Sequence, residues 1–153
     1  MSGNPEARGA EIVLVEESVT EITHTLNVFK KANISNELHV IKQPVELMDF
    51  LLRSGSFTGH KPLSSTVLVL ISLNLTGMHG PDFLRKIKGD ERTNALPVIM
   101  LTSSQEQRGV MESYKIGAIA CIVKPFDLAS FVEAVADLRL GWLLTGLADV
   151  ADD

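Results

Sequence analysis

The stretch Val67-Leu68-Val69-Leu70-Ile71-Ser72 decides the fold that we predict for this chain. Its apolar run has no polar residue until Ser72, so a strand built from it would be buried on both faces. Strands of that kind are typical of parallel sheets, in which helices cover both faces. We therefore predict a central parallel strand at residues 67–71, with the side chain of Ser72 at its carboxyl end.

Four further short apolar runs accompany this strand along the chain. They are residues 12–15, 38–41, 97–101 and 120–123. Segments with helical periodicity lie between them, so strand and helix alternate five times. This order predicts an α/β fold, a doubly wound five-stranded parallel sheet of (βα)5 form with helices on both faces.

Start and stop signals delimit the predicted helices. Ser18 and Glu21 form a capping box at the start of the first helix. The buried face of that helix is expected to carry Val19, Ile22, Leu26 and Phe29. The limits of the later helices are marked by Pro44, Pro81, Gly117 and Asp127. The apolar stripe of the fifth helix comprises Leu128, Phe131, Val135 and Leu138.

Composition restricts the functional class. A chain of 153 residues with net charge −5 is most simply one domain, and its acidity argues against nucleic-acid binding. A single cysteine excludes a disulfide framework and fits a reducing, cytoplasmic location. No apolar run approaches the ~18–20 residues that span a bilayer. Residues 1–10 are predicted to be a disordered lead-in, and residues 145–153 a short acidic tail.

Polar side chains follow four of the five predicted strands. They are Glu16 and Glu17, Ser72, Thr102, and Lys124. The carboxyl ends of parallel strands meet at one edge of the sheet, where such folds collect their functional groups. Each residue alone is unremarkable, and Thr102 could simply cap a helix. Together, acids, hydroxyls and a lysine at successive strand ends indicate a phosphoryl-accepting site.

With these motifs in place, residues 11–144 resemble the receiver domain of two-component response regulators, the CheY-like domain with a flavodoxin-like fold. Leu-Thr-Ser-Ser at 101–104, Val-Lys-Pro at 123–125 and the segment 138–144 are similar to the stand-alone receivers that serve bacterial phytochrome-type histidine kinases. The resemblance implies a role in phosphorelay signal transduction and a histidine kinase as the partner.

The resemblance assigns a role to each matching position. Glu16 and Glu17 match the family's acidic pair, of which the second usually ligates magnesium. Asn74 matches the residue whose backbone carbonyl completes the metal shell. Thr102 matches the switch hydroxyl, and Lys124 matches the lysine that pairs with a phosphoryl oxygen.

The chain departs from the family at the decisive position, because Ser72 stands where the phosphoacceptor aspartate is expected. A neutral hydroxyl with no histidine base beside it is a poor nucleophile. The formal charge of the site falls from −2 to −1, so magnesium gains less by binding. Thr76, His79 and Cys121 also replace the usual proline, acidic residue and reporting aromatic.

We therefore expect a degenerate receiver that is not an enzyme. It would bind a histidine kinase or its partners independently of phosphorylation, with no cofactor beyond weak Mg²⁺ at Glu17 and Asn74 and with Lys124 bridging Glu16 and Glu17. One alternative is a working receiver with an unconventional phosphate or metal response. Another is a flavodoxin-like nucleotide-binding enzyme, which the two glutamates disfavour because they would repel phosphate. The sequence identifies neither the kinase nor its signal, nor whether the protein activates or inhibits.

A homodimer is also expected, through the fourth helix, the fifth strand and the fifth helix. The predicted interface residues are Phe131, Leu140, Trp142, Leu143 and Leu144. Exposed apolar patches of this kind usually mark interfaces. The alternative is that Trp142 folds back on the core of its own chain.

Overall fold

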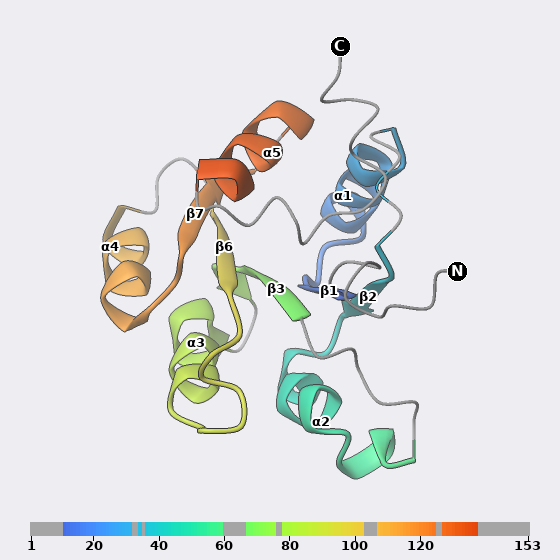
Figure 1. The fold of residues 1–153 in the computed structure, drawn as a ribbon, viewed down its shortest axis with the longest axis vertical. Coiled ribbons are helices and arrows are strands. Elements are labelled where there is room, and N and C mark those ends of the chain that lie inside the picture. Colours follow the sequence, from blue (N-terminus) through green and yellow to red (C-terminus); the bar gives the residue numbers. More distant parts are fainter. Residues whose placement is uncertain are drawn as a thin grey trace.

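A computed structural model of the chain describes residues 11–31, 34, 36–59, 67–75, 78–102, 107–124 and 127–137. Five parallel strands form one sheet in the order β2-β1-β3-β6-β7, which confirms the predicted doubly wound topology (Figure 1). The strands are β1 (Glu11–Val15), β2 (Leu38–Ile41), β3 (Val67–Ser72), β6 (Val98–Thr102) and β7 (Ala120–Val123). Each agrees with its predicted range to within one residue at either end.

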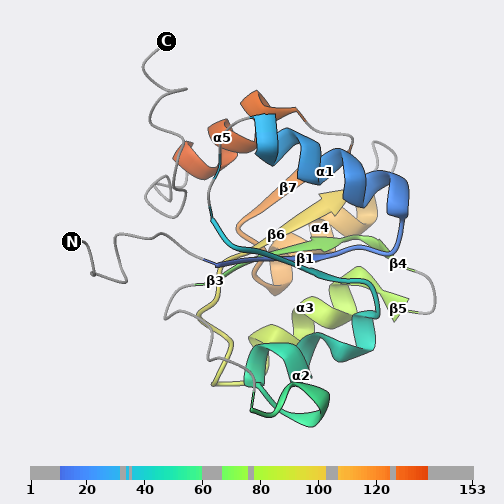
Figure 2. The same ribbon diagram turned by 90° about the vertical axis from the view of Figure 1, so that its right-hand side faces the viewer.

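Helices cover both faces of this sheet. Figure 2 shows α1 and α5 on one side and α2 and α3 on the other. The helices are α1 (Val19–Lys31), α2 (Leu47–Leu52), α3 (Gly80–Lys88), α4 (Gln107–Ile116) and α5 (Leu128–Asp137). Two 3-10 turns, η2 (Pro44–Glu46) and η3 (Gly55–Phe57), precede and follow α2. Among the described residues, no helix combines the length and the apolarity needed to cross a membrane.

The alternating side chains of β1 and β3 supply two separate cores. Val13 and Val69 pack toward α2 and α3, whereas Leu14 and Leu70 pack toward α1 and α5. All four are fully buried, as expected for strands in the middle of a parallel sheet. The sheet is therefore held from both sides, and its carboxyl edge is a rigid base for the residues that follow the strands.

The buried face of α1 differs from the predicted one. Ile22 and Phe29 are buried as expected, but Val19 is 67% exposed and Leu26 is 40% exposed. The buried position between Ile22 and Phe29 is taken by Thr25. The helix is rotated toward Thr25, so two apolar residues on the other flank of the stripe face solvent. The pattern of apolar residues alone could not show this rotation, because Thr25 is polar.

Phe131 belongs to the core of the chain, which corrects its assignment to the dimer interface. Its side chain is fully buried, and the centroid of its ring lies 5.1 Å from the centroid of the Phe29 ring. Asp127 caps the helix as predicted, because the backbone N–H of Ser130 donates to Asp127 Oδ1 at 2.8 Å. This bond lowers the pKa of Asp127. The other predicted interface residues, Leu140, Trp142, Leu143 and Leu144, lie outside the described residues, as do residues 1–10 and 145–153.

A small hairpin follows β3 that the sequence did not predict. Its strands β4 (Asn74–Leu75) and β5 (Met78–His79) are antiparallel, with Asn74 opposite His79. Gly80 then starts α3 against the end of β3, and its N–H donates to the carbonyl of Leu73 at 3.1 Å. A Cβ at Gly80 would lie 2.8 Å from the backbone of Leu73, so only glycine permits this approach. The hairpin thus begins at a fixed place directly after Ser72.

Candidate functional site

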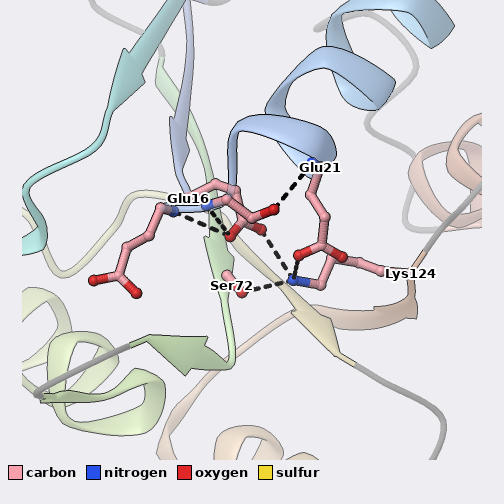
Figure 3. Close-up of polar contacts among 6 residues, drawn as sticks. Glu16, Glu21, Ser72 and Lys124 are labelled. Atoms are coloured by element: carbon pink, nitrogen blue, oxygen red, sulfur yellow. Dashed lines mark hydrogen bonds and ion pairs between the residues drawn. The ribbon is translucent and has the colours of Figure 1, made fainter.

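The predicted site residues of β1, β3 and β7 meet at the carboxyl edge of the sheet. Figure 3 shows Glu16, Glu21 and Ser72 converging on the amino group of Lys124. Lys124 Nζ lies 2.9 Å from Glu16 Oε1, 2.8 Å from Glu21 Oε2 and 2.8 Å from Ser72 Oγ. The lysine is therefore surrounded by three oxygen acceptors of its own chain.

The backbone at the end of β7 fixes the position of Lys124. Its N–H donates to the carbonyl of Thr102 at 2.6 Å and extends the β6–β7 pairing by one residue. The side chain of Lys124 is only 9% exposed. Thr102 is itself buried at the end of β6, in the place predicted for it. The two residues are thus neighbours at the sheet edge, as the strand pattern indicated.

Glu16 is a buried carboxylate whose two oxygens are both engaged. Oε2 accepts hydrogen bonds from the backbone N–H groups of Glu17 at 3.0 Å and Ser18 at 3.2 Å, and Oε1 accepts from Lys124. The residue is 3% exposed. Burying a charge of this kind is costly unless it is paired and hydrogen-bonded, and here it is both.

Glu21 is the residue that the sequence reading missed. Its backbone N–H donates to Ser18 Oγ at 3.3 Å, which confirms that half of the predicted capping box. Its side chain reaches Lys124. The sequence predicts that Lys124 bridges Glu16 and Glu17. In the structure, Lys124 bridges Glu16 and Glu21, which lies in the first turn of α1. The sequence does contain a signal for this contact. Glu21 is an acidic residue in the first turn of a helix that starts shortly after the acidic pair.

Glu21 changes the charge of the site. With Glu16, Glu17 and Lys124 it gives a formal charge of −2, where −1 was expected without it. A third carboxylate is thus present, but it comes from α1 and not from the end of β3. Glu21 is 37% exposed, so its ion pair with Lys124 is screened by solvent more than that of Glu16.

Ser72 is fully buried at the end of β3, where it is paired in register with Leu101 of β6. Its hydroxyl accepts a hydrogen bond from Lys124 Nζ. A hydroxyl becomes a useful nucleophile only when a base removes its proton, and a protonated lysine is a donor that cannot act as that base. The contact with Lys124 therefore does not activate the oxygen of Ser72.

Cys121, in the middle of β7, is contacted by a tyrosine of the adjacent helix. Its backbone N–H donates to the hydroxyl of Tyr114 in α4 at 3.1 Å. Burial raises the pKa of the Cys121 thiol, and burial also raises the pKa of Tyr114. The thiol therefore stays protonated at neutral pH and is not a reactive cysteine.

Comparison with known proteins gives a single consistent result. The family model described as response regulator receiver domain matches residues 12–136. The response regulator Rcp1 of a Synechocystis strain is 28% identical over 134 residues, covering 88% of this chain and 89% of that protein.

Solved structures agree with it. The bacteriophytochrome response regulator RtBRR superposes with a TM-score of 0.74 at 33% identity, covering 84% of this chain and 77% of that one. The bacteriophytochrome response regulator AtBRR superposes with a TM-score of 0.74 at 32% identity, covering 86% of this chain and 93% of that one. The Mn(2+)-bound form of Rcp1 superposes with a TM-score of 0.69 at 27% identity, covering 89% of this chain and 96% of that one.

Proposed function

Because this chain belongs to the response regulator receiver domain family of two-component signalling, we propose that it binds a histidine kinase, or a partner of that kinase, without being phosphorylated. The observation that carries this proposal is the set of acceptors around Lys124. Ser72, Glu16 and Glu21 already occupy its amino group. The protein would then act as a binding module in which the contacts of Lys124 stay the same whether or not a phosphodonor is present.

The chemistry of phosphoryl transfer supports this reading. Transfer to a receiver requires an oxygen nucleophile that is ionised at neutral pH, together with positive charge that is available to the incoming phosphoryl group. The hydroxyl of Ser72 is neutral, and the charge of Lys124 is compensated by two carboxylates. Both requirements are weakened at once. Receiver domains are generally not enzymes, and we propose no enzymatic activity here.

Magnesium fits this site only weakly. The donors remaining from the family pattern are carboxylate oxygens and the backbone carbonyl of Asn74, which are types that Mg²⁺ accepts. Both oxygens of Glu16 are already engaged by N–H donors. We therefore propose that Glu17 and Asn74 would hold the ion, with low affinity. Bound there, it would supply positive charge next to Ser72.

The relatives suggest which kinase is the partner. RtBRR and AtBRR are bacteriophytochrome response regulators, and the similarity to each covers more than four fifths of this chain. We propose that the partner is a phytochrome-type histidine kinase, bound in the cytoplasm. A receiver that docks without accepting the phosphoryl group could compete with a working receiver for the same kinase.

We expect the affinity for that kinase to be independent of phosphorylation. Isothermal titration of the protein into the dimerisation domain of a phytochrome-type kinase from the same organism should give one dissociation constant. That constant should be the same with and without acetyl phosphate and Mg²⁺. A working receiver of the same organism, measured in parallel, should show a change. A phosphodonor-dependent affinity of the wild-type protein, or no binding at all, would defeat the proposal.

We further propose a homodimer on the α4–β7 face. Met111 and Tyr114 of α4 and Val123 of β7 are 62%, 51% and 50% exposed. Strand β7 is at an end of the sheet, and α4 packs beside it. Large apolar side chains exposed together on adjacent elements usually mark an interface.

Light scattering at high micromolar concentration is expected to give twice the 16.7 kDa mass of one chain, without any phosphodonor. Met111→Lys should shift the protein to the monomer, because it places a charge in the interface. Val45→Lys is the matched control, since Val45 is 74% exposed in η2, which follows β2 at the opposite edge of the sheet from β7. A wild-type mass of 16.7 kDa under these conditions would exclude the dimer.

A further inference from the structure

A second cluster of polar side chains lies at the amino edge of the sheet, where β1 and β2 begin. It consists of Glu11, Glu37 and His39. His39 Nε2 lies 2.7 Å from Glu11 Oε1 and 3.6 Å from Glu37 Oε2. One ligand atom from each residue lies within 4.8 Å of both others. Ser72 and Lys124 are at the carboxyl ends of their strands, so this cluster belongs to a different edge.

The backbone fixes the three residues relative to one another. β1 and β2 pair in register, with Val13 opposite His39, and Ile12 N–H donates to the carbonyl of Glu37 at 2.8 Å. The imidazole of His39 also packs on Phe50 of α2, with ring centroids 5.1 Å apart. Glu11 and His39 are therefore held by two paired strands, and Glu37, which directly precedes β2, is tied to β1 by its backbone carbonyl.

The spacing of the donors suits a tetrahedral metal ion. Zinc binds histidine nitrogen and carboxylate oxygen at about 2.0–2.2 Å, which places neighbouring ligand atoms roughly 3.3 Å apart. The two distances from His39 Nε2 lie on either side of that value. Small side-chain adjustments would bring the three donors to their bonding positions. Glu37 is 62% exposed and could adjust freely, whereas Glu11 and His39 are 15% and 21% exposed.

The charges of the cluster point in the same direction. Nε2 of a neutral imidazole carries at most one hydrogen, so it can donate to only one of the two carboxylates. A divalent cation would compensate both acids and would use the imidazole lone pair. Mixed imidazole and carboxylate donors favour zinc and related transition metals over magnesium or calcium, which prefer oxygen ligands alone.

We propose that Glu11, Glu37 and His39 form a binding site for a divalent transition-metal ion, zinc above all, with the remaining coordination positions open to water. An ion bound there would join the start of β1 to the outer strand β2. The site is independent of the signalling function proposed above. It would make the stability of this corner of the sheet depend on metal.

Cobalt is the probe for the test, because it replaces zinc and gives visible ligand-field absorption. The untagged protein, in excess Mg²⁺ that occupies the carboxylate site at the other edge, should develop a visible band that saturates at one Co²⁺ per chain. Zinc should abolish the band. Zinc alone should also raise the melting temperature, because an ion that binds only the folded state stabilises it.

Two variants test the proposed ligands, and a third is the control. Glu37→Gln and His39→Gln should each weaken Co²⁺ binding at least about tenfold, because even the loss of a group that only supports a ligand typically costs roughly that much. His24→Gln removes an imidazole from α1 and should leave the titration unchanged. Glu37 is mostly exposed, so its variant tests the site even if His39→Gln fails to fold. Absence of a saturable band in the wild-type protein, or a band that survives Glu37→Gln undiminished, would overturn the proposal.

Discussion

Ser72→Asp is expected to take up phosphate, whereas we expect the wild-type protein to take up none. The change places a carboxylate beside Lys124 Nζ, which now lies 2.8 Å from the hydroxyl of Ser72. A carboxylate is ionised at neutral pH and can attack a phosphoryl group directly. It also adds an oxygen ligand for Mg²⁺ next to the acidic pair. Incubation with acetyl phosphate and Mg²⁺ should give one added phosphoryl group per chain by intact mass spectrometry.

Ser72→Asn is the matched control, because it has nearly the same shape as Ser72→Asp and lacks the charge. It should remain unmodified under identical conditions. We expect the phosphorylated Ser72→Asp protein to keep its oligomeric state and its affinity for the kinase, because the resemblance to receivers places Cys121 where that family carries a reporting aromatic. A folded Ser72→Asp variant that takes up no phosphate would show that Glu16, Glu17 and Lys124 are structural only.

Lys124→Met is expected to lower the free energy of unfolding by about 3 kcal/mol, because it leaves a buried carboxylate without its partner. Glu16 is 3% exposed, so water cannot replace the lost contact. The hydrogen bonds from Glu17 and Ser18 remain and keep the loss at the lower end of the usual range. Urea unfolding at neutral pH measures the difference.

Two controls separate this effect from general damage. Glu16→Gln combined with Lys124→Met should recover more than half of the lost stability, because the buried charge is gone. Lys86→Met removes a lysine from the exposed surface of α3 and should change stability by no more than about 0.5 kcal/mol. If Lys124→Met unfolds at the same urea concentration as the wild-type protein, the ion pair with Glu16 contributes nothing to the fold.

The five strands could be predicted from the sequence because each one is a short apolar run buried on both faces. Parallel topology then follows from the alternation with helices, and it brings Glu16, Ser72, Thr102 and Lys124 to one edge. No knowledge of side-chain packing is needed for these steps, since the carboxyl ends of parallel strands coincide. The structure and its likeness to RtBRR confirm the predicted fold.

The contacts that depend on how a helix is rotated could not be predicted. The orientation of α1 decides that Thr25 is buried, that Val19 is exposed, and that Glu21 reaches Lys124. A capping box gives the helix its start but does not say where the glutamate side chain will point. The sequence alone predicts Phe131 both on an apolar stripe and at an interface, and only its packing against Phe29 decides between them.

The cluster of Glu11, Glu37 and His39 was invisible for a different reason. Its members come from β1, from β2 and from the residue directly before β2, and their spacing along the chain matches no metal-binding motif. Only the register between β1 and β2 brings Glu11 and His39 together. Sites of this kind depend on strand pairing, so a search for histidines at short spacing does not find them.

We propose that the wild-type protein works without phosphorylation. Intact mass spectrometry after incubation with a phosphorylated phytochrome-type histidine kinase and Mg²⁺ tests it most directly, with Ser72→Asp in a parallel reaction as the positive control. We expect an unchanged mass for the wild-type chain, while Ser72→Asp gains one phosphoryl group. A phosphoryl group found on Ser72 of the wild-type protein would show that it is a phosphoryl acceptor and would refute the proposed function.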